Sequence, residues 1–204
     1  MYKKIIKRVL DIVFSLLLLP FVIVVLIIMG LIIYFNDKGP IFYNAPRLGY
    51  KGKTFKMYKL RSMKVDAPDI RNEDGSTFNS ENDPRVTTIG KLIRKTSVDE
   101  LPQLFNVLKG DMSFVGPRPD LPESINFYEE YELNRLEVLP GITGYSQAFV
   151  RNSVSWKERI KNDLYYTENI AFSLDYRIII QTIKTVFNKK NIYANQVNNV
   201  DEGF

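Results

Sequence analysis

The sequence contains no cysteine and no histidine among its 204 residues. Without cysteine, the chain has no means of forming a disulfide or a zinc–thiolate site. Most of the common enzyme nucleophiles and bases are also missing, so carboxylates must carry most of any chemistry here. The formal net charge of +5 favours an anionic partner such as a lipid headgroup, a nucleotide or a nucleic acid.

A long uncharged, apolar run extends from Ile12 to Phe35. A helix of this length measures roughly 36 Å, enough to cross a hydrocarbon core of about 30 Å. Signal peptides have apolar regions of only about 7–15 residues that end at small residues, whereas this run continues into Asn36 and Asp37. The segment is therefore predicted to be a membrane anchor.

Basic residues flank this anchor on both sides: Lys3, Lys4, Lys7 and Arg8 before it, and Lys38, Arg47, Lys51, Lys53, Lys56, Lys59 and Arg61 after it. Such flanks are usually cytoplasmic, so a straight span would leave one of them on the wrong side. Pro20 lies within the run and forces a kink, because it removes a helix hydrogen bond. A re-entrant helix, kinked at Pro20 and returning to the same face, satisfies both flanks. A tilted span in which Pro20 is a tolerated kink is the alternative.

The composition predicts three parts: residues 1–37 as the membrane helix with its basic N-terminus, 38–187 as one domain, and 188–204 as a polar tail. The domain is expected to be α+β, predominantly helical with short strands. Apolar and cationic residues alternate along Thr54–Arg61 after a hairpin turn, which is typical of a strand. Residues 66–85 are polar and predict a long surface loop.

The remaining elements follow from apolar spacing and from turn residues. Helices are predicted, in order, over Thr88–Lys95, from the acid pair at 99–100 to about Leu108, over Pro122–Leu139, and twice within Trp156–Phe187. A short strand is predicted at Ser113–Val115. Asp163 and Asp175 are interpreted as helix-surface or capping residues, with support of a site as the weaker alternative.

Two adjacent carboxylates, Asp99 and Glu100, follow the basic stretch Lys91–Lys95. A carboxylate is able to attack phosphorus and hold a phosphoryl group, while nearby cations neutralise phosphate charge. The pair is therefore a candidate for phosphoryl chemistry on an anionic, metal-bound substrate. The alternative is structural, because Ser97-x-x-Glu100 also fits a capping box that starts a helix, and acids stabilise a helix N-terminus.

Several motifs stand in one order along the chain up to about Phe187: Lys7–Asp11, Gly39–Phe42, Arg47–Gly49, Phe55–Met63, Arg94–Ser113, Gly116–Pro119 and Pro140–Gly144. This combination resembles the bacterial sugar transferase family, the small monotopic phosphoglycosyl transferases. The resemblance implies transfer of a sugar phosphate from a UDP-sugar to a polyprenol phosphate, expected to be undecaprenyl phosphate, with release of UMP. That reaction would start the assembly of a membrane glycan.

The resemblance also implies a location and a set of partners. The anchor is expected to be re-entrant, packed on a cytoplasmic catalytic domain that has interfacial amphipathic helices. The protein would then be monotopic in the bacterial inner membrane and in contact with inner-leaflet phospholipids. No nucleic-acid partner is implied, and a homodimer is an open alternative.

The resemblance assigns the catalytic roles to the acid pair. Asp99 would attack the sugar-bearing phosphorus and form a covalent aspartyl phosphosugar, and Glu100 would position metal or acceptor or act as a base. Mg²⁺ is the expected cofactor, because it prefers carboxylate and phosphate oxygens, and Asp99 is its expected ligand.

Five basic residues are candidate phosphate or substrate ligands: Arg94, Arg118, Lys59, Arg61 and Arg151. Arg118 stands between two prolines that restrict its backbone, and arginine offers a planar fork to phosphate oxygens. Lys59 and Arg61 are alternatively ligands of anionic lipid headgroups. For each of the five, a solvated surface cation is the structural interpretation.

The chain departs from the family pattern at two places. Relatives often carry Ser-Pro at the helix break, whereas this chain has Leu19-Pro20. Many relatives read Trp-x-Gln where this chain has Tyr145-Ser146-Gln147, so the donor sugar is not carried over. Two other functions fit the residues: a membrane-anchored scaffold whose basic surface binds anionic lipid or nucleic acid, and a metal-dependent hydrolase of lipid pyrophosphates.

Overall fold

The computed structural model describes residues 1–70, 78, 80, 82–150 and 153–187. The α-helices are α1 (Lys7–Asp37), α2 (Thr88–Thr96), α3 (Gln103–Lys109), α4 (Tyr145–Phe149), α5 (Trp156–Glu168) and α6 (Phe172–Phe187). The strands are β1 (Phe42–Leu48), β2 (Thr54–Leu60), β3 (Ser113–Val115) and β4 (Gly141–Thr143). A π-helical turn at Tyr2–Ile6 precedes α1, and 3₁₀ helices lie at Tyr50–Gly52, Val98–Glu100, Pro122–Phe127 and Glu130–Leu136. The expected mostly helical fold with short strands is confirmed.

Helix α1 buries one face and exposes the rest. Its buried residues, Asp11, Ser15, Val22, Leu26, Gly30 and Ile33, recur at helical spacing. The apolar side chains around them are exposed, with Leu17 at 70%, Phe21 at 67% and Phe35 at 76%. An exposed apolar surface of this extent needs a partner, and lipid is the natural one for a helix long and apolar enough to cross a membrane.

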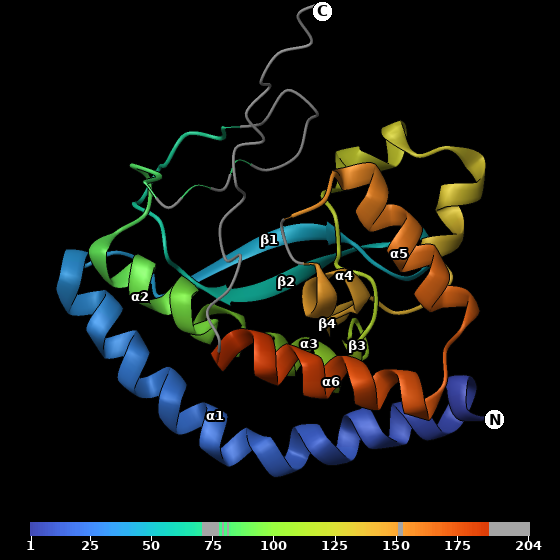
Figure 1. Ribbon diagram of the computed structural model, residues 1–204. Coiled ribbons are helices and arrows are strands. Elements are labelled where there is room, and N and C mark those ends of the chain that lie inside the picture. The colour runs from blue at the N-terminus through green and yellow to red at the C-terminus, as the bar shows by residue number, and fades with distance from the viewer. Residues whose placement is uncertain (71–77, 79, 81, 151–152, 188–204) are drawn as a thin grey trace, which may run out of the picture.

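Helix α1 continues unbroken through Pro20. It bends along its length, and the other elements lie on the inner side of the bend (Figure 1). A bend is expected where proline removes a backbone hydrogen bond. The re-entrant path through a membrane, the break at Pro20 and the interfacial helices stay predictions.

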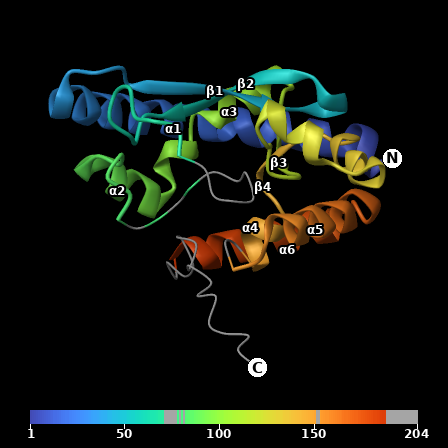
Figure 2. The ribbon, with the colours of Figure 1, turned by 90° about the horizontal axis from the view of Figure 1, so that it is seen from above.

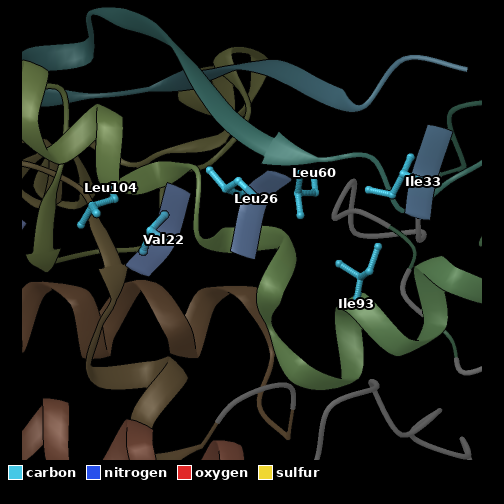
Figure 3. Packing of buried hydrophobic residues seen from close by; sticks show 6 residues of the cluster. All are labelled: Val22, Leu26, Ile33, Leu60, Ile93 and Leu104. Carbon is cyan, nitrogen blue, oxygen red and sulfur yellow. The ribbon is translucent and has the colours of Figure 1, made fainter. Parts of the chain in front are cut away.

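The core of the domain forms where α1 meets β2, α2 and α3. Six buried side chains gather there, as Figure 3 shows: Val22, Leu26, Ile33, Leu60, Ile93 and Leu104. Val98 and Leu101, which flank the acid pair, pack against the same cluster. The acid pair is therefore flanked by residues of the core to which α1 contributes Val22, Leu26 and Ile33.

Strands β1 and β2 form the predicted hairpin, with Tyr43 opposite Lys59. A buried amide, Asn106 of α3, fixes this hairpin to the helix. Its Oδ1 accepts a hydrogen bond from the backbone N–H of Tyr58 (2.9 Å), and its Nδ2 donates to the carbonyl of Lys56 (2.7 Å). The amide thereby sets the position of β2, and so of Lys59, relative to α3.

Strands β3 and β4 pair in parallel and bring residues 113–115 beside 141–143. Two glycines permit this approach, because a Cβ on Gly141 would lie 2.1 Å from the Gly116 nitrogen, and one on Gly116 would lie 2.3 Å from the Leu139 carbonyl oxygen. The chain leaves β3 directly into Gly116–Pro119. The close pairing therefore fixes the start of the segment that carries Arg118.

Helices α4, α5 and α6 lie together on one side of the molecule, as the second view shows (Figure 2). Asp175 of α6 joins them to the start of α1, since it accepts hydrogen bonds from Tyr2 and Lys7, both at 2.6 Å. The interpretation of Asp163 and Asp175 as surface or capping residues is wrong, because both are buried and bonded to distant side chains.

Two further predictions need correction. The helix expected over Pro122–Leu139 is instead two 3₁₀ helices, Pro122–Phe127 and Glu130–Leu136, separated by extended backbone at Tyr128 and Glu129. The loop predicted over residues 66–85 is not surface throughout, because Asp83 and Arg85 form a buried ion pair at 2.7 Å.

Candidate active site

The acid pair lies in a single 3₁₀ turn, Val98–Glu100, between α2 and α3. Ser97 ends α2 in the left-handed conformation with a φ of 57°. The side chain of Ser97 makes no capping hydrogen bond to the turn that follows, so the capping-box interpretation is wrong. The turn places Val98 and Leu101 against the core, while Asp99 and Glu100 meet basic side chains.

Lys59 of β2 reaches both acids. Its Nζ lies 3.0 Å from Glu100 Oε1 and 3.6 Å from Asp99 Oδ2. Arg118 approaches from the Gly116–Pro119 segment, with both terminal nitrogens 3.2 Å from Glu100 Oε1. Two of the predicted substrate ligands, Lys59 and Arg118, are thus in direct contact with the predicted catalytic pair.

Arg94, in the last turn of α2, is the third basic residue near the acid pair. Its Nε donates a hydrogen bond of 2.9 Å to the Ser62 hydroxyl, which orients the guanidinium. Its charge is close enough to favour the ionised form of Asp99 and so to oppose the rise in the pKa of that carboxyl. Two carboxylates and three cations (Lys59, Arg94 and Arg118) leave the cluster with one formal positive charge, which suits an anionic substrate.

The pKa values of the two acids are shifted in opposite directions. Burial raises the pKa of Asp99, which is only 8% exposed, although Lys59 opposes the shift. Burial also acts to raise the pKa of Glu100, but Lys59 and Arg118 outweigh it and hold that pKa well below its usual range. Adjacent acids with opposite pKa shifts are typical of catalytic pairs in which the two carboxyls have different roles.

The other predicted residues lie elsewhere. Arg61 follows the end of β2 and forms hydrogen bonds away from the acid pair, with both Asp37 carboxylate oxygens (2.5 and 2.7 Å) and the carbonyls of Pro40 and Met63. It joins the end of α1 to the hairpin. Arg151 lies outside the described residues, as does the tail over 188–204.

Most of the residues that support this site were not singled out from the sequence. Asn106, Ser62, Asp120 and Arg135 are such residues, and Asp163 was given a supporting role only as the weaker alternative. Arg135 bonds to the carbonyl of Arg118 and to the carboxylates of Asp120 and Asp163. The one sequence signal for such roles is a polar residue that stands among apolar residues in a predicted helix or strand. Within the described part of the chain, no three acidic residues gather into a metal site.

Comparison with known proteins gives the site its context. Residues 2–189 match the family described as bacterial sugar transferase. The chain belongs to the bacterial sugar transferase family. All residues of the candidate site lie inside the matched region, and the resemblance inferred from the motifs is confirmed.

Three relatives illustrate the range of this family. The chain is 39% identical to an uncharacterized sugar transferase, EpsL, of Bacillus subtilis, over 92% of this chain and 90% of that protein. It is also 39% identical, over 92% of its length in each case, to the undecaprenyl-phosphate galactose phosphotransferase of Salmonella typhimurium and to the undecaprenyl-phosphate glucose phosphotransferase of Komagataeibacter xylinus. This sugar transferase chain spans only 41% and 37% of those two longer proteins.

Proposed function

We propose that this chain is a phosphoglycosyl transferase that moves a sugar 1-phosphate from a UDP-sugar to a polyprenol phosphate. One observation carries the proposal: Asp99 is buried beside Glu100 in a turn on which Lys59 and Arg118 converge. The names of the Salmonella and Komagataeibacter relatives support an undecaprenyl-phosphate acceptor. Those names specify galactose for one protein and glucose for the other. They therefore do not assign a donor sugar to this chain, and a donor screen is needed to identify it.

The reaction proceeds in two displacements. A carboxylate oxygen of Asp99 attacks the sugar-bearing phosphorus, the bond from that phosphorus to the bridging oxygen breaks, and UMP leaves with the bridging oxygen. A phosphate oxygen of the polyprenol phosphate then attacks the same phosphorus. The bond to Asp99 breaks, the carboxylate is regenerated, and the lipid pyrophosphate sugar departs. Splitting the transfer in this way replaces one difficult step with two easier ones.

The basic residues neutralise the negative charges of the pyrophosphate and the carboxylate, which these steps bring together. A pyrophosphate beside a carboxylate nucleophile is repelled unless cations screen it. The side chain of Arg118 is 47% exposed, so an incoming phosphate is able to reach the guanidinium while Glu100 holds it beside the acid pair. Lys59 contacts both acids and opposes the rise in the pKa of Asp99, which favours the ionised form that attacks.

The donor set fits Mg²⁺. Magnesium is usually held by one or two carboxylates together with substrate phosphates rather than by an all-protein cage. Asp99, with Glu100 beside it, offers such a set, and no larger acidic cluster is needed in the described residues. When bound, the ion would supply charge neutralisation at the pyrophosphate.

The core cluster shared by the acid turn and α1 supports a reaction at the membrane surface. Val98 and Leu101 pack on the cluster that contains Val22 and Leu26 of the anchor. A lipid-borne phosphate and a soluble nucleotide sugar both have access to such a position. We place the domain on the cytoplasmic side of the bacterial inner membrane, where UDP-sugars are available, with α1 as a re-entrant helix among inner-leaflet phospholipids.

The test is UMP release by the purified chain in undecaprenyl-phosphate-containing vesicles with Mg²⁺, across UDP-glucose, UDP-galactose and their N-acetylated counterparts. Continuous UMP release with one donor is expected, and chelation of Mg²⁺ is expected to stop it. With the acceptor omitted, release should end after about one UMP per chain. A hydrolase would continue to turn over without acceptor, and a scaffold would release no UMP with any donor.

Replacing Lys59 with methionine is expected to move the acid limb of the kcat/KM pH profile to higher pH. Burial raises the pKa of Asp99 and Lys59 opposes that rise, so loss of the cation raises the pKa further. Attack requires the ionised carboxylate. As the pH is lowered, the variant therefore loses activity at a higher pH than the unmodified chain does. Lys56→Met, at an exposed position of the same strand, is the matched control. An acid limb that stays in place in Lys59→Met would contradict this assignment.

A further inference from the structure

A buried arginine outside the acid pair holds the segment that carries Arg118. Arg135 lies in the 3₁₀ helix Glu130–Leu136 and is only 4% exposed. Its Nη2 donates a hydrogen bond of 2.9 Å to the backbone carbonyl of Arg118. Its Nη1 lies 2.5 Å from Asp120 Oδ2, two residues further along the same segment. One guanidinium therefore grips the Arg118 segment at two points.

Arg135 is itself held from the opposite side by α5. Its Nη2 lies 2.5 Å from Asp163 Oδ2, and both side chains are nearly inaccessible to solvent. Asp120 is fixed further by Tyr128, whose hydroxyl donates at 2.8 Å, and by Trp156, whose Nε1 donates at 3.1 Å. The chain of contacts runs from α5 through Arg135 to the backbone of Arg118, and each link is buried or partly buried.

This network is poorly explained as a source of stability. Buried ion pairs often contribute little net stability, because both charges must leave water. Burial raises the pKa of Asp163 to about 6, whereas Arg135 opposes this rise and favours the ionised carboxylate. An ion pair of this kind suits a positioning role, because the planar guanidinium contacts oxygens of Arg118, Asp120 and Asp163 and the Tyr128 hydroxyl at once.

The direction of the Arg118 side chain depends on how its backbone is fixed. Its side chain is about half exposed, and its guanidinium donates two hydrogen bonds to one and the same atom, Glu100 Oε1. Pro117 and Pro119 stiffen the chain on either side, but stiffness alone does not set the direction of the segment. The grip on the Arg118 carbonyl and on Asp120 supplies that direction.

We propose that Arg135, clamped between Asp120 and Asp163, is the positioning residue that aims Arg118 at the substrate phosphate. This inference rests on the phosphate-binding role given to Arg118 under the proposed function. Arg135 touches no reacting atom in this scheme and acts only through the backbone of Arg118. Displacements of about 1 Å at a catalytic group are enough to cost roughly 100-fold in rate.

A double-mutant cycle tests the inference with the full-length chain in vesicles, using the donor that gives UMP release. Arg135→Gln is expected to lower kcat/KM by roughly 10- to 100-fold and to raise KM for the UDP-sugar, because a misdirected Arg118 binds phosphate less well. In an Arg118→Ala background, the same substitution is expected to change either constant by less than about twofold. Equal losses in both backgrounds would overturn the inference, as would a lower kcat at unchanged KM.

Lys157→Gln is the matched control. Lys157 also joins α5 to the Glu130–Leu136 helix, through Glu132 at 2.7 Å. It further contacts Glu129, the carbonyl of Phe127 and the ring of Trp156, but among the described residues no member of the Arg118 segment itself is one of these partners. It is expected to retain activity within about twofold. Thermal unfolding shows whether each variant folds, and Asp163→Asn, which loosens Arg135 while keeping its own size, should repeat the pattern with a smaller loss.

The outcomes separate this inference from the function on which it rests. If Arg118→Ala retains full activity, the role of Arg118 fails and the positioning role fails with it. If Arg118→Ala loses activity while folded Arg135→Gln and Asp163→Asn both retain it, only the positioning role is lost. In that case Arg135 does not act on the reaction through Arg118.

Discussion

Replacing Asp99 with asparagine is expected to stop UMP release while the chain stays folded and bound to membranes. Asparagine keeps the size of the side chain but has no carboxylate to attack phosphorus. Loss of the nucleophile is expected to lower kcat by at least roughly 10³-fold, a scale typical for nucleophile substitutions. The measurement is UMP release at saturating donor and acceptor, together with recovery of radiolabelled sugar phosphate on the protein when the acceptor is omitted.

The folded state is expected to tolerate this substitution. Because burial raises the pKa of Asp99, the folded chain binds this proton more tightly than the unfolded chain does. Stability therefore falls as the pH rises from the ordinary aspartate value through the raised pKa, and the ionised carboxylate is a net cost at neutral pH. Asparagine removes that charge, so the unfolding temperature at pH 7 should not fall.

Asp66→Asn is the control for Asp99→Asn. Asp66 is exposed and has a φ of 57°, a conformation that asparagine also tolerates. It should release UMP and form the labelled adduct as the unmodified chain does. A labelled protein in the Asp99→Asn variant, or undiminished turnover by it, would remove the covalent mechanism.

Local sequence patterns drew attention to the centre of the candidate site, and the family resemblance gave its residues their expected roles. Asp99 and Glu100 are neighbours in the chain, and Arg118 stands between two prolines, so each was conspicuous without any tertiary information. Lys59 was a candidate ligand of phosphate or of lipid headgroups, and the structure brings it to the acid pair. The long apolar helix was equally plain, because about 24 uncharged residues in succession are typical of a segment that enters a membrane.

Arg61, a candidate ligand of phosphate or of lipid headgroups, lies away from the acid pair for a physical reason. A period of two places Lys59 and Arg61 on one face only while the strand continues, and β2 ends at Leu60. Met57 and Leu60, three residues apart, are both buried, so the pattern is already broken before the end. Arg61 turns instead to Asp37, 24 residues earlier, a partner that local spacing does not specify.

The supporting polar groups were beyond prediction for a related reason. Asn106 bonds to β2 across about 50 positions of the chain, and Asp163 bonds to Arg135 across 28. Such pairs depend on how helices and strands pack. Asp163 in isolation has the spacing of an ordinary helix-surface acid, and only the docking of α5 on the Glu130–Leu136 helix buries it.

Removing the Arg118 guanidinium is expected to have the second largest effect on activity. Arg118→Ala should lower kcat/KM by roughly 10²–10³-fold, in part through a higher KM for the UDP-sugar, because the substrate phosphate loses a preorganised positively charged group. Arg118→Lys should recover only part of the loss, because an ammonium group does not make the two-pronged contact of a guanidinium. Steady-state UMP release measures both, with Lys161→Ala at an exposed position of α5 as the surface-cation control.

Stability separates this functional loss from a structural one. The Arg118–Glu100 pair is half exposed on the arginine side, and such pairs contribute only about 0–1 kcal/mol to folding. Glu100 also keeps Lys59 as a partner at 3.0 Å, so Arg118→Ala leaves no unpaired buried charge. An unchanged unfolding temperature with a large fall in kcat/KM is therefore the expected result. Retention of kcat/KM within about twofold would show that the phosphate is held by other cations of the cluster.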